Sequence, residues 1–140
     1  MSATVELIRM RSNPVKYIDD KINEISEIAL VNVGEDRDKV KLEKQIKCDV
    51  AGEFNSYLRD IKMGLNEPLE AINESRRVAR RLTYYCQANI SPDQLYFGFR
   101  ALYRVARDQT ELLPELEQLL LNRALENLQI TNRLSQNQKP

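Results

Sequence analysis

The sequence contains no histidine among its 140 residues. Histidine is the commonest general base and a usual metal ligand, so its absence excludes Ser-His and Cys-His nucleophile pairs. It also excludes the carboxylate-bridged di-iron site of helical bundles in its usual form, which needs Glu-x-x-His pairs. We therefore expect no catalytic residue, and the sequence favours a protein that is not an enzyme.

Glycine and cysteine are also scarce. The four glycines lie far apart and none follows a strand pattern, so the sequence has no glycine-rich phosphate loop. The two cysteines, Cys48 and Cys86, are too few for a disulfide framework, and their separation fits no zinc pattern. Thiols in a reducing cytosol are the expected state.

A metal site made of carboxylates alone is the remaining cofactor hypothesis. Glu67, Glu70 and Glu74 share part of one helix face and could in principle hold magnesium. The stronger interpretation pairs Glu74 with Arg77, three residues later, on a solvated surface. We therefore expect neither a metal nor a cofactor, and no small-molecule substrate is evident.

Long apolar runs are missing too. No segment is apolar over the length of a membrane span, and residues 1–12 have no apolar run long enough for a signal peptide. Lysine plus arginine and aspartate plus glutamate both number 21, so no overall field draws the chain to nucleic acid or membrane. We expect a cytoplasmic protein without membrane contact, with one domain over residues 1–135 and a frayed polar tail over 136–140.

What the sequence does contain is helical periodicity. Apolar residues make up 42% of the chain and recur at steps of three and four, with no sustained alternation. The pattern predicts helices over 14–34, 36–63 and 68–88, a fourth from 92, and a fifth from about 110 to 134. Short connections favour antiparallel neighbours. The predicted fold class is all-α, an up-and-down helical bundle of four principal helices plus a shorter N-terminal helix.

Local signals support two of these helix starts. Asn13 before proline reads as a cap followed by the first helical residue. Ser91 reads as a cap as well, with proline next and Gln94 where a capping box needs it. Gly52 lies inside the predicted second helix, where glycine is unfavourable, and it suggests a close helix crossing.

Arginine has an uneven distribution. From residue 63 to residue 138 every cation is arginine, whereas the lysines cluster between residues 16 and 62. On the third and fourth predicted helices, aromatic residues accompany arginines away from the apolar stripe. Arginine and aromatics without lysine are typical of protein interfaces. The candidate partner-binding residues are Arg76, Arg77, Arg80, Arg81, Tyr84, Tyr96, Phe97, Arg100, Arg104 and Arg107.

Three interpretations of this surface compete: a protein-binding or self-association surface, a nucleic-acid-binding surface, and a solvated face with incidental aromatics. The leucines of the fifth helix (113, 116, 119, 120, 121, 125 and 128) cover a wide face, so either another chain buries the surplus or the helix is central. Our leading hypothesis is a non-catalytic helical protein-interaction module, an adaptor, assembly subunit or regulator that also self-associates. The alternative is a small nucleic-acid-binding subunit that uses the arginine/aromatic face.

Overall fold

The computed structural model describes the backbone of residues 3–31, 33–34, 38–64, 68–86 and 90–138, and the side-chain surroundings of 5–31, 33–34, 38–64, 71–84 and 90–126. Within these ranges the chain forms six α-helices, one short 3-10 helix and no strand. They are α1 (Ala3–Ser12), α2 (Pro14–Leu30), α3 (Lys39–Lys62), α4 (Pro68–Cys86), α5 (Pro92–Asp108), η1 (Thr110–Leu112) and α6 (Leu113–Gln138). The prediction of an all-α helical bundle is confirmed.

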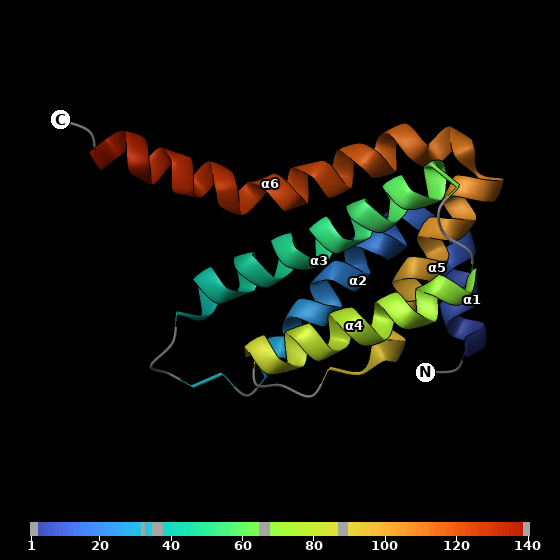
Figure 1. Ribbon diagram of the computed structural model, residues 1–140, viewed down its shortest axis with the longest axis horizontal. Coiled ribbons are helices and arrows are strands. Elements are labelled where there is room, and N and C mark those ends of the chain that lie inside the picture. Colours follow the sequence, from blue (N-terminus) through green and yellow to red (C-terminus); the bar gives the residue numbers. More distant parts are fainter. Residues whose placement is uncertain (1–2, 32, 35–37, 65–67, 87–89, 139–140) are drawn as a thin grey trace.

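Helix α2 is in contact with every other α-helix of the bundle. The long helices α3 and α6 pack along each other, and α4 packs along α5. Figure 1 shows that successive helices from α2 to α6 reverse direction and that the last turns of α6 extend away from the other helices. Because α6 lies at the edge and packs chiefly on α3, a central position does not account for its many leucines.

The two predicted helix caps are formed. The side-chain oxygen of Asn13 accepts a hydrogen bond at 3.1 Å from the backbone N–H three residues later, at the start of α2. The hydroxyl of Ser91 accepts one at 3.3 Å from the N–H two residues later, at the start of α5. Gln94 behaves differently from the prediction, because its side-chain oxygen lies 3.5 Å from Nζ of Lys21 instead of closing a capping box.

Several helices begin or end at other residues than the apolar periodicity predicts. Helix α2 ends at Leu30 rather than near residue 34, and α3 begins at Lys39. Asp38 sets that start, because its side chain accepts a hydrogen bond at 3.1 Å from the N–H of Lys41. At the other end, α6 stays helical through Gln138, so the backbone of the expected tail is helical as far as that residue.

The close helix crossing lies at Gly98 in α5, not at Gly52. A Cβ at Gly98 would lie 2.5 Å from Cζ of Phe54, whereas a Cβ at Gly52 would have no neighbour within 4 Å. The Phe54 ring packs over Gly98 and meets Phe99 edge-on, with 5.1 Å between the ring centroids. This contact brings α3 and α5 together and turns the opposite side of α5 outward.

Helix α1 is the element that the sequence pattern does not predict. Its apolar residues do not share one face: Met10 is buried, but Leu7 is exposed and 60% of Ile8 is accessible to solvent. Helix α1 packs against α2, and as described below, polar contacts hold it there. This placement matters because α1 borders the outer side of α5.

Candidate interaction surface

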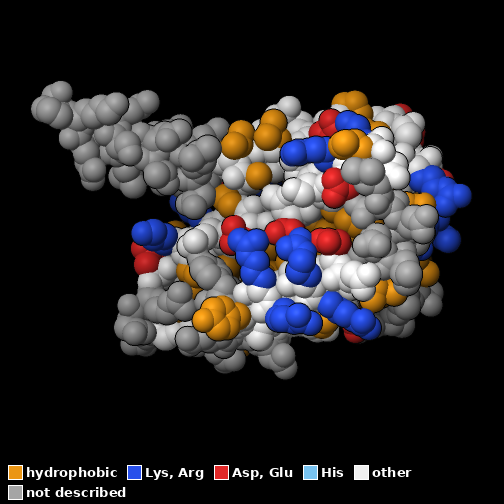
Figure 2. All heavy atoms as spheres, viewed as in Figure 1, with side chains coloured by type: hydrophobic (Ala, Val, Ile, Leu, Met, Phe, Trp, Pro, Cys, Tyr) orange, Lys and Arg blue, Asp and Glu red, His pale blue; other side chains and the backbone are white. Residues whose placement is uncertain are grey.

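The exposed arginines of α4 fall into two groups, and the first points toward α3. Arg77 contacts Glu53 of α3 at 2.6 Å and Glu74 of α4 at 2.7 Å, so the predicted Glu74–Arg77 pair is present. Arg81 contacts the other oxygen of Glu53 at 3.0 Å. Figure 2 shows basic side chains beside acidic ones on the face that carries α3 and α4. The chain's own carboxylates therefore neutralise these two arginines.

The electrostatics of this group follow from the same contacts. Hydrogen bonds to Glu74 and Glu53 raise the pKa of Arg77 above its usual value, so its charge is fixed. Burial raises the pKa of Asp49, an effect that the nearby Arg81 opposes. Arg77 and Arg81 therefore form ion pairs with carboxylates of their own chain.

The second group on α4 faces solvent. Arg76 and Arg80 line a shallow hollow of about 440 Å³, together with Tyr84 and with residues that lead into α5. Tyr84 is 89% exposed, the most exposed large hydrophobic side chain among the described residues. The remaining lining residues are Ala79, Thr83, Ile90 and Pro92. This hollow therefore combines one open aromatic ring with two cations.

The α5 candidates line a separate groove, which we call the α1–α5 groove. It has a volume of about 330 Å³. Its lining consists of Leu7 and Met10 from α1 and of Tyr96, Phe97, Arg100, Tyr103, Arg104, Arg107 and Asp108 from α5. All five α5 residues predicted from the sequence therefore meet in one concave site, and those of α4 lie outside it.

Aromatic rings form an apolar wall in this groove. Tyr96 and Phe97 are half-buried and pack against the core, with 5.8 Å between their ring centroids. Tyr103 lies beneath Arg107, whose guanidinium carbon is 6.0 Å from the ring centroid and whose NH1 donates to the hydroxyl at 3.4 Å. Sequence geometry puts Phe97 opposite the stripe of α5, but the structure gives its ring a partly buried position.

The arginines of the groove differ from the others in their partners. Among the residues whose side chains are described, neither Arg100, Arg104 nor Arg107 forms an ion pair with a carboxylate. By contrast, Arg9 and Arg123 each have carboxylate partners. The groove thus combines an apolar wall with three cations that the described part of the chain does not neutralise.

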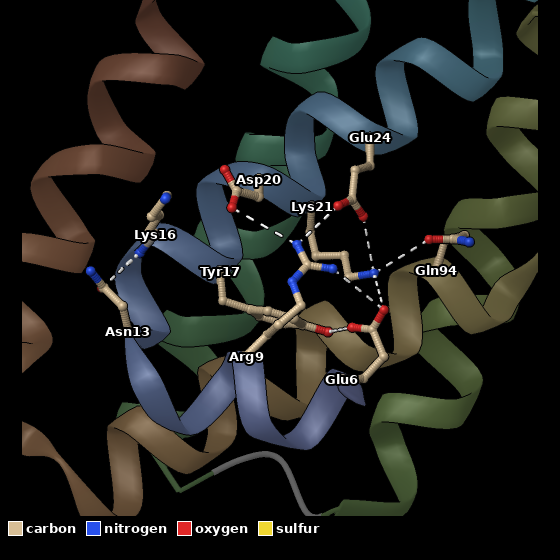
Figure 3. A network of polar contacts seen from close by, with 9 residues as sticks. All are labelled: Glu6, Arg9, Asn13, Lys16, Tyr17, Asp20, Lys21, Glu24 and Gln94. Atoms are coloured by element: carbon tan, nitrogen blue, oxygen red, sulfur yellow. Dashed lines mark hydrogen bonds and ion pairs between the residues drawn. The ribbon is translucent and has the colours of Figure 1, made fainter. Parts of the chain in front are cut away.

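A buried polar network fixes α1, the other wall of the groove (Figure 3). Lys21 of α2 is 2% exposed, and its Nζ lies 3.1 Å from Oε1 of Glu6 and 3.1 Å from Oε2 of Glu24. The hydroxyl of Tyr17 donates to the other carboxylate oxygen of Glu6. Arg9 of α1 closes the network at 3.0 Å from Oε1 of Glu24. Helix α1 is therefore attached to α2 through the buried pair of Glu6 and Lys21 and through the partly exposed pair of Arg9 and Glu24.

The ionisation of this network is set by its hydrogen bonds. Burial raises the pKa of Glu6, but hydrogen bonds from Tyr17 and Lys21 and the charges of Lys21 and Arg9 outweigh it, so the pKa of Glu6 lies below its usual value. Burial and the bond to Glu6 raise the pKa of Tyr17. At neutral pH the pair is thus an ionised carboxylate and a protonated phenol.

Four groove residues were missed by sequence reasoning. Tyr103 could have been found, because it follows Arg100 by three residues and precedes Arg107 by four, which places it on the same side of α5. Asp108 lies one residue beyond that row. Leu7 and Met10 gave no usable signal, because residues 3–12 lack an apolar stripe. One wall of the groove is therefore formed by α1, a helix that the apolar pattern of residues 3–12 does not predict.

The remaining candidate chemistry is limited within the described part of the chain. No group of three or more Cys, Asp or Glu side chains there could hold a metal ion. The side chains of Glu67, Glu70 and Cys86 lie outside the described residues. The thiol of Cys48 donates to the backbone carbonyl of Arg123 at 3.1 Å. None of the described helices is long and apolar enough to cross a bilayer.

No protein-family model matches the chain, and comparison with curated proteins and with solved structures finds no match either.

Proposed function

We propose that this protein is a non-catalytic protein-interaction module that binds its partner in the α1–α5 groove. One observation carries the proposal: Arg100, Arg104 and Arg107 stand over a half-buried aromatic wall, with no ion pair to a described carboxylate. Arginine and aromatic residues are enriched in the centres of protein interfaces. The groove has that composition and a concave shape.

The outer side of α1 supports the same surface. Leu7 lines the groove and is exposed, so it adds an apolar side chain of α1 to the aromatic wall of α5. Exposed apolar side chains that cluster, rather than scatter, are typical of binding sites. The non-catalytic part of the proposal rests on the absence of histidine and on the buried Glu6, Tyr17 and Lys21, whose polar atoms contact one another.

Affinity capture from the native host with matched variants tests the proposal. Replacing Arg100 and Arg104 with alanine should reduce capture of the partner by about tenfold or more, because interface arginines contribute strongly to affinity. Arg76→Ala with Arg80→Ala removes the same charge from α4 and should leave capture unchanged. Nuclease treatment should have no effect. If the α4 variant loses the partner and the α5 variant keeps it, the proposal is wrong.

Self-association is a separate part of the proposal, and α6 supports it. Leu121 is 43% exposed although α6 packs along α3, and the final turns of α6 extend from the bundle (Figure 1). Light scattering on the purified chain measures this directly. A concentration-dependent rise in mass is expected, and Leu121→Glu should reduce it. A strict monomer at high micromolar concentration would overturn this part.

Nucleic-acid binding is the second candidate, and the hollow at Tyr84 favours it. An open aromatic ring beside Arg76 and Arg80 suits a stacked base whose neighbouring phosphates contact the two arginines. A gel-shift series tests it: binding to single strands should weaken with salt, with a slope of about −0.7 per phosphate contact. Tyr84→Ala should weaken binding and Arg100→Ala should not. Absence of binding at low salt excludes this candidate.

A further inference from the structure

We infer that the segment bound in the α1–α5 groove is an acidic amphipathic helix of a partner protein. The inference rests on the proposed function and adds the chemistry of the bound segment. The length of the groove, the order of its arginines and the nature of its apolar wall carry it, and each restricts the partner independently.

The groove has the length and the walls of a helix-binding site. From Tyr96 to Arg107, α5 rises about 16 Å at 1.5 Å per residue, the length of a bound helix of about eleven residues. Leu7 and Met10 of α1 form the facing wall. A hollow bordered by two helices can bind a third helix, which inserts apolar side chains spaced at steps of three and four residues.

The arginines specify the charge of that helix. Arg100, Arg104 and Arg107 follow one another at steps of four and three, within about 60° of one side of α5. Carboxylates at the same steps on a bound helix have matching rises of about 6 and 4.5 Å. A guanidinium binds a carboxylate through two parallel N–H groups, which gives such pairs their strength and direction. No ion pair with a described carboxylate competes for these groups.

The apolar wall requires an amphipathic partner instead of a uniformly acidic one. Leu7 is exposed, and Tyr96 and Phe97 are half-buried beside it, so apolar side chains on one face of the partner would cover them. The acidic residues must then lie on the adjacent face, toward the arginines. A helix with leucine or phenylalanine at one stripe and carboxylates beside it satisfies both requirements.

Two features favour a protein helix over nucleic acid in this groove. Asp108 lies at one end and would repel a continuous chain of phosphates. Tyr96 and Phe97 pack against each other and against the core, which leaves their ring faces less open to bases than that of Tyr84. A bound helix can carry its carboxylates opposite the arginines and away from Asp108, whereas a continuous chain of phosphates would also pass Asp108.

A displayed library of random peptides of about 14 residues, selected on the full chain, tests the inference. Peptides enriched on the wild type should carry apolar residues at steps of three and four, with aspartate or glutamate beside them. A second selection uses R100E/R104E and should enrich lysine and arginine instead. Enriched acidic peptides should bind R100E/R104E about tenfold or more weakly. They should bind the α4 control R76E/R80E, which has the same charge change, as they bind the wild type.

The outcomes separate this inference from the proposed function. If the enriched peptides bind R100E/R104E more weakly than the wild type but have the acid content of the unselected library, the groove is a binding site and the inferred chemistry is wrong. If no peptide is enriched over the support alone, neither the inference nor the groove as a peptide-binding site stands. Circular dichroism of R100E/R104E checks the fold, and R100K/R104K, which keeps the charge but loses the paired N–H groups, should show an intermediate loss. Full affinity in R100K/R104K would overturn the carboxylate contacts.

Discussion

Nζ of Lys21 lies 3.1 Å from Oε1 of Glu6, and both side chains are buried. The pair joins α1 to α2 across fifteen residues of sequence. A buried charge that loses its partner remains desolvated, so such pairs are costly to break singly even where the intact pair adds little stability. This pair, with Tyr17, decides whether α1 stays in place.

Replacing Lys21 with methionine should therefore destabilise the protein by about 3 kcal/mol, because Glu6 stays buried without the cation that donates a hydrogen bond to it. Arg9, whose NH1 lies 3.7 Å from Oε1 of Glu6, offsets only part of this loss. Urea unfolding measures the loss. Glu6→Gln combined with Lys21→Met should lose less than the sum of the two single variants, since neither charge is then stranded. Strictly additive effects would show that the two groups are not coupled. Faster hydrogen exchange over residues 5–12 should accompany the single Lys21 variant.

The lowered pKa of Glu6 gives a second prediction. Its pKa in the unfolded chain is near 4.5 and its folded value is lower, so it stabilises the fold above pH 4.5 and loses that contribution as the pH falls through the folded value. Urea midpoints measured from about pH 6 down to about pH 3 should fall less steeply in Glu6→Gln than in the wild type. Glu27→Gln changes an exposed carboxylate and should follow the wild type. An unchanged slope in Glu6→Gln would contradict the prediction.

The two glycines in helices α3 and α5 make a matched pair for packing. Gly98→Ala places a methyl group against the Phe54 ring and should destabilise the fold by about 1–3 kcal/mol. Gly52→Ala meets open space within a helix and should stabilise the fold by about 0.5–1 kcal/mol. Thermal or urea unfolding of both variants gives the comparison. Equal effects would mean that Phe54 moves aside without cost.

The arginines of α4 that contact α3 should contribute little to binding. Arg77→Ala and Arg81→Ala remove exposed ion pairs with Glu53, and each should change stability by less than about 1 kcal/mol. Because these guanidinium groups already contact carboxylates of their own chain, partner capture should be unchanged. Loss of capture in Arg77→Ala, with the fold intact by circular dichroism, would move the interaction surface to α4.

Local signals were the predictable part of this fold. Asn13 and Ser91 act on N–H groups two or three residues away, so their caps could be read directly from the sequence. Gln94 could not, because its side chain meets Lys21, seventy-three residues distant. Periodicity gave the face of α5 that turns outward. It could not show that α1 would cover part of that face, because α1 docks through Glu6 and Lys21.

The same reasoning explains the glycines and the arginines. A glycine allows close approach only if a large side chain lies opposite, and the sequence does not tell which helix faces Gly52 or Gly98. Likewise, the sequence groups Arg77 with Arg100 by composition. In the structure, the packing of α3 beside α4 places Glu53 against Arg77, whereas Arg100 lines the groove.

The burial of Lys21 makes this amine a chemical reporter of the groove. An acylating reagent reaches an amine only when water does, so Lys21 should resist labelling while the exposed Lys16 in the same helix reacts quickly. Each event that lifts α1 from α2 would expose Lys21 and remove one wall of the groove together. The labelling rate of Lys21, measured by mass spectrometry, therefore reports how often α1 separates from α2. A partner bound in the groove should lower this rate.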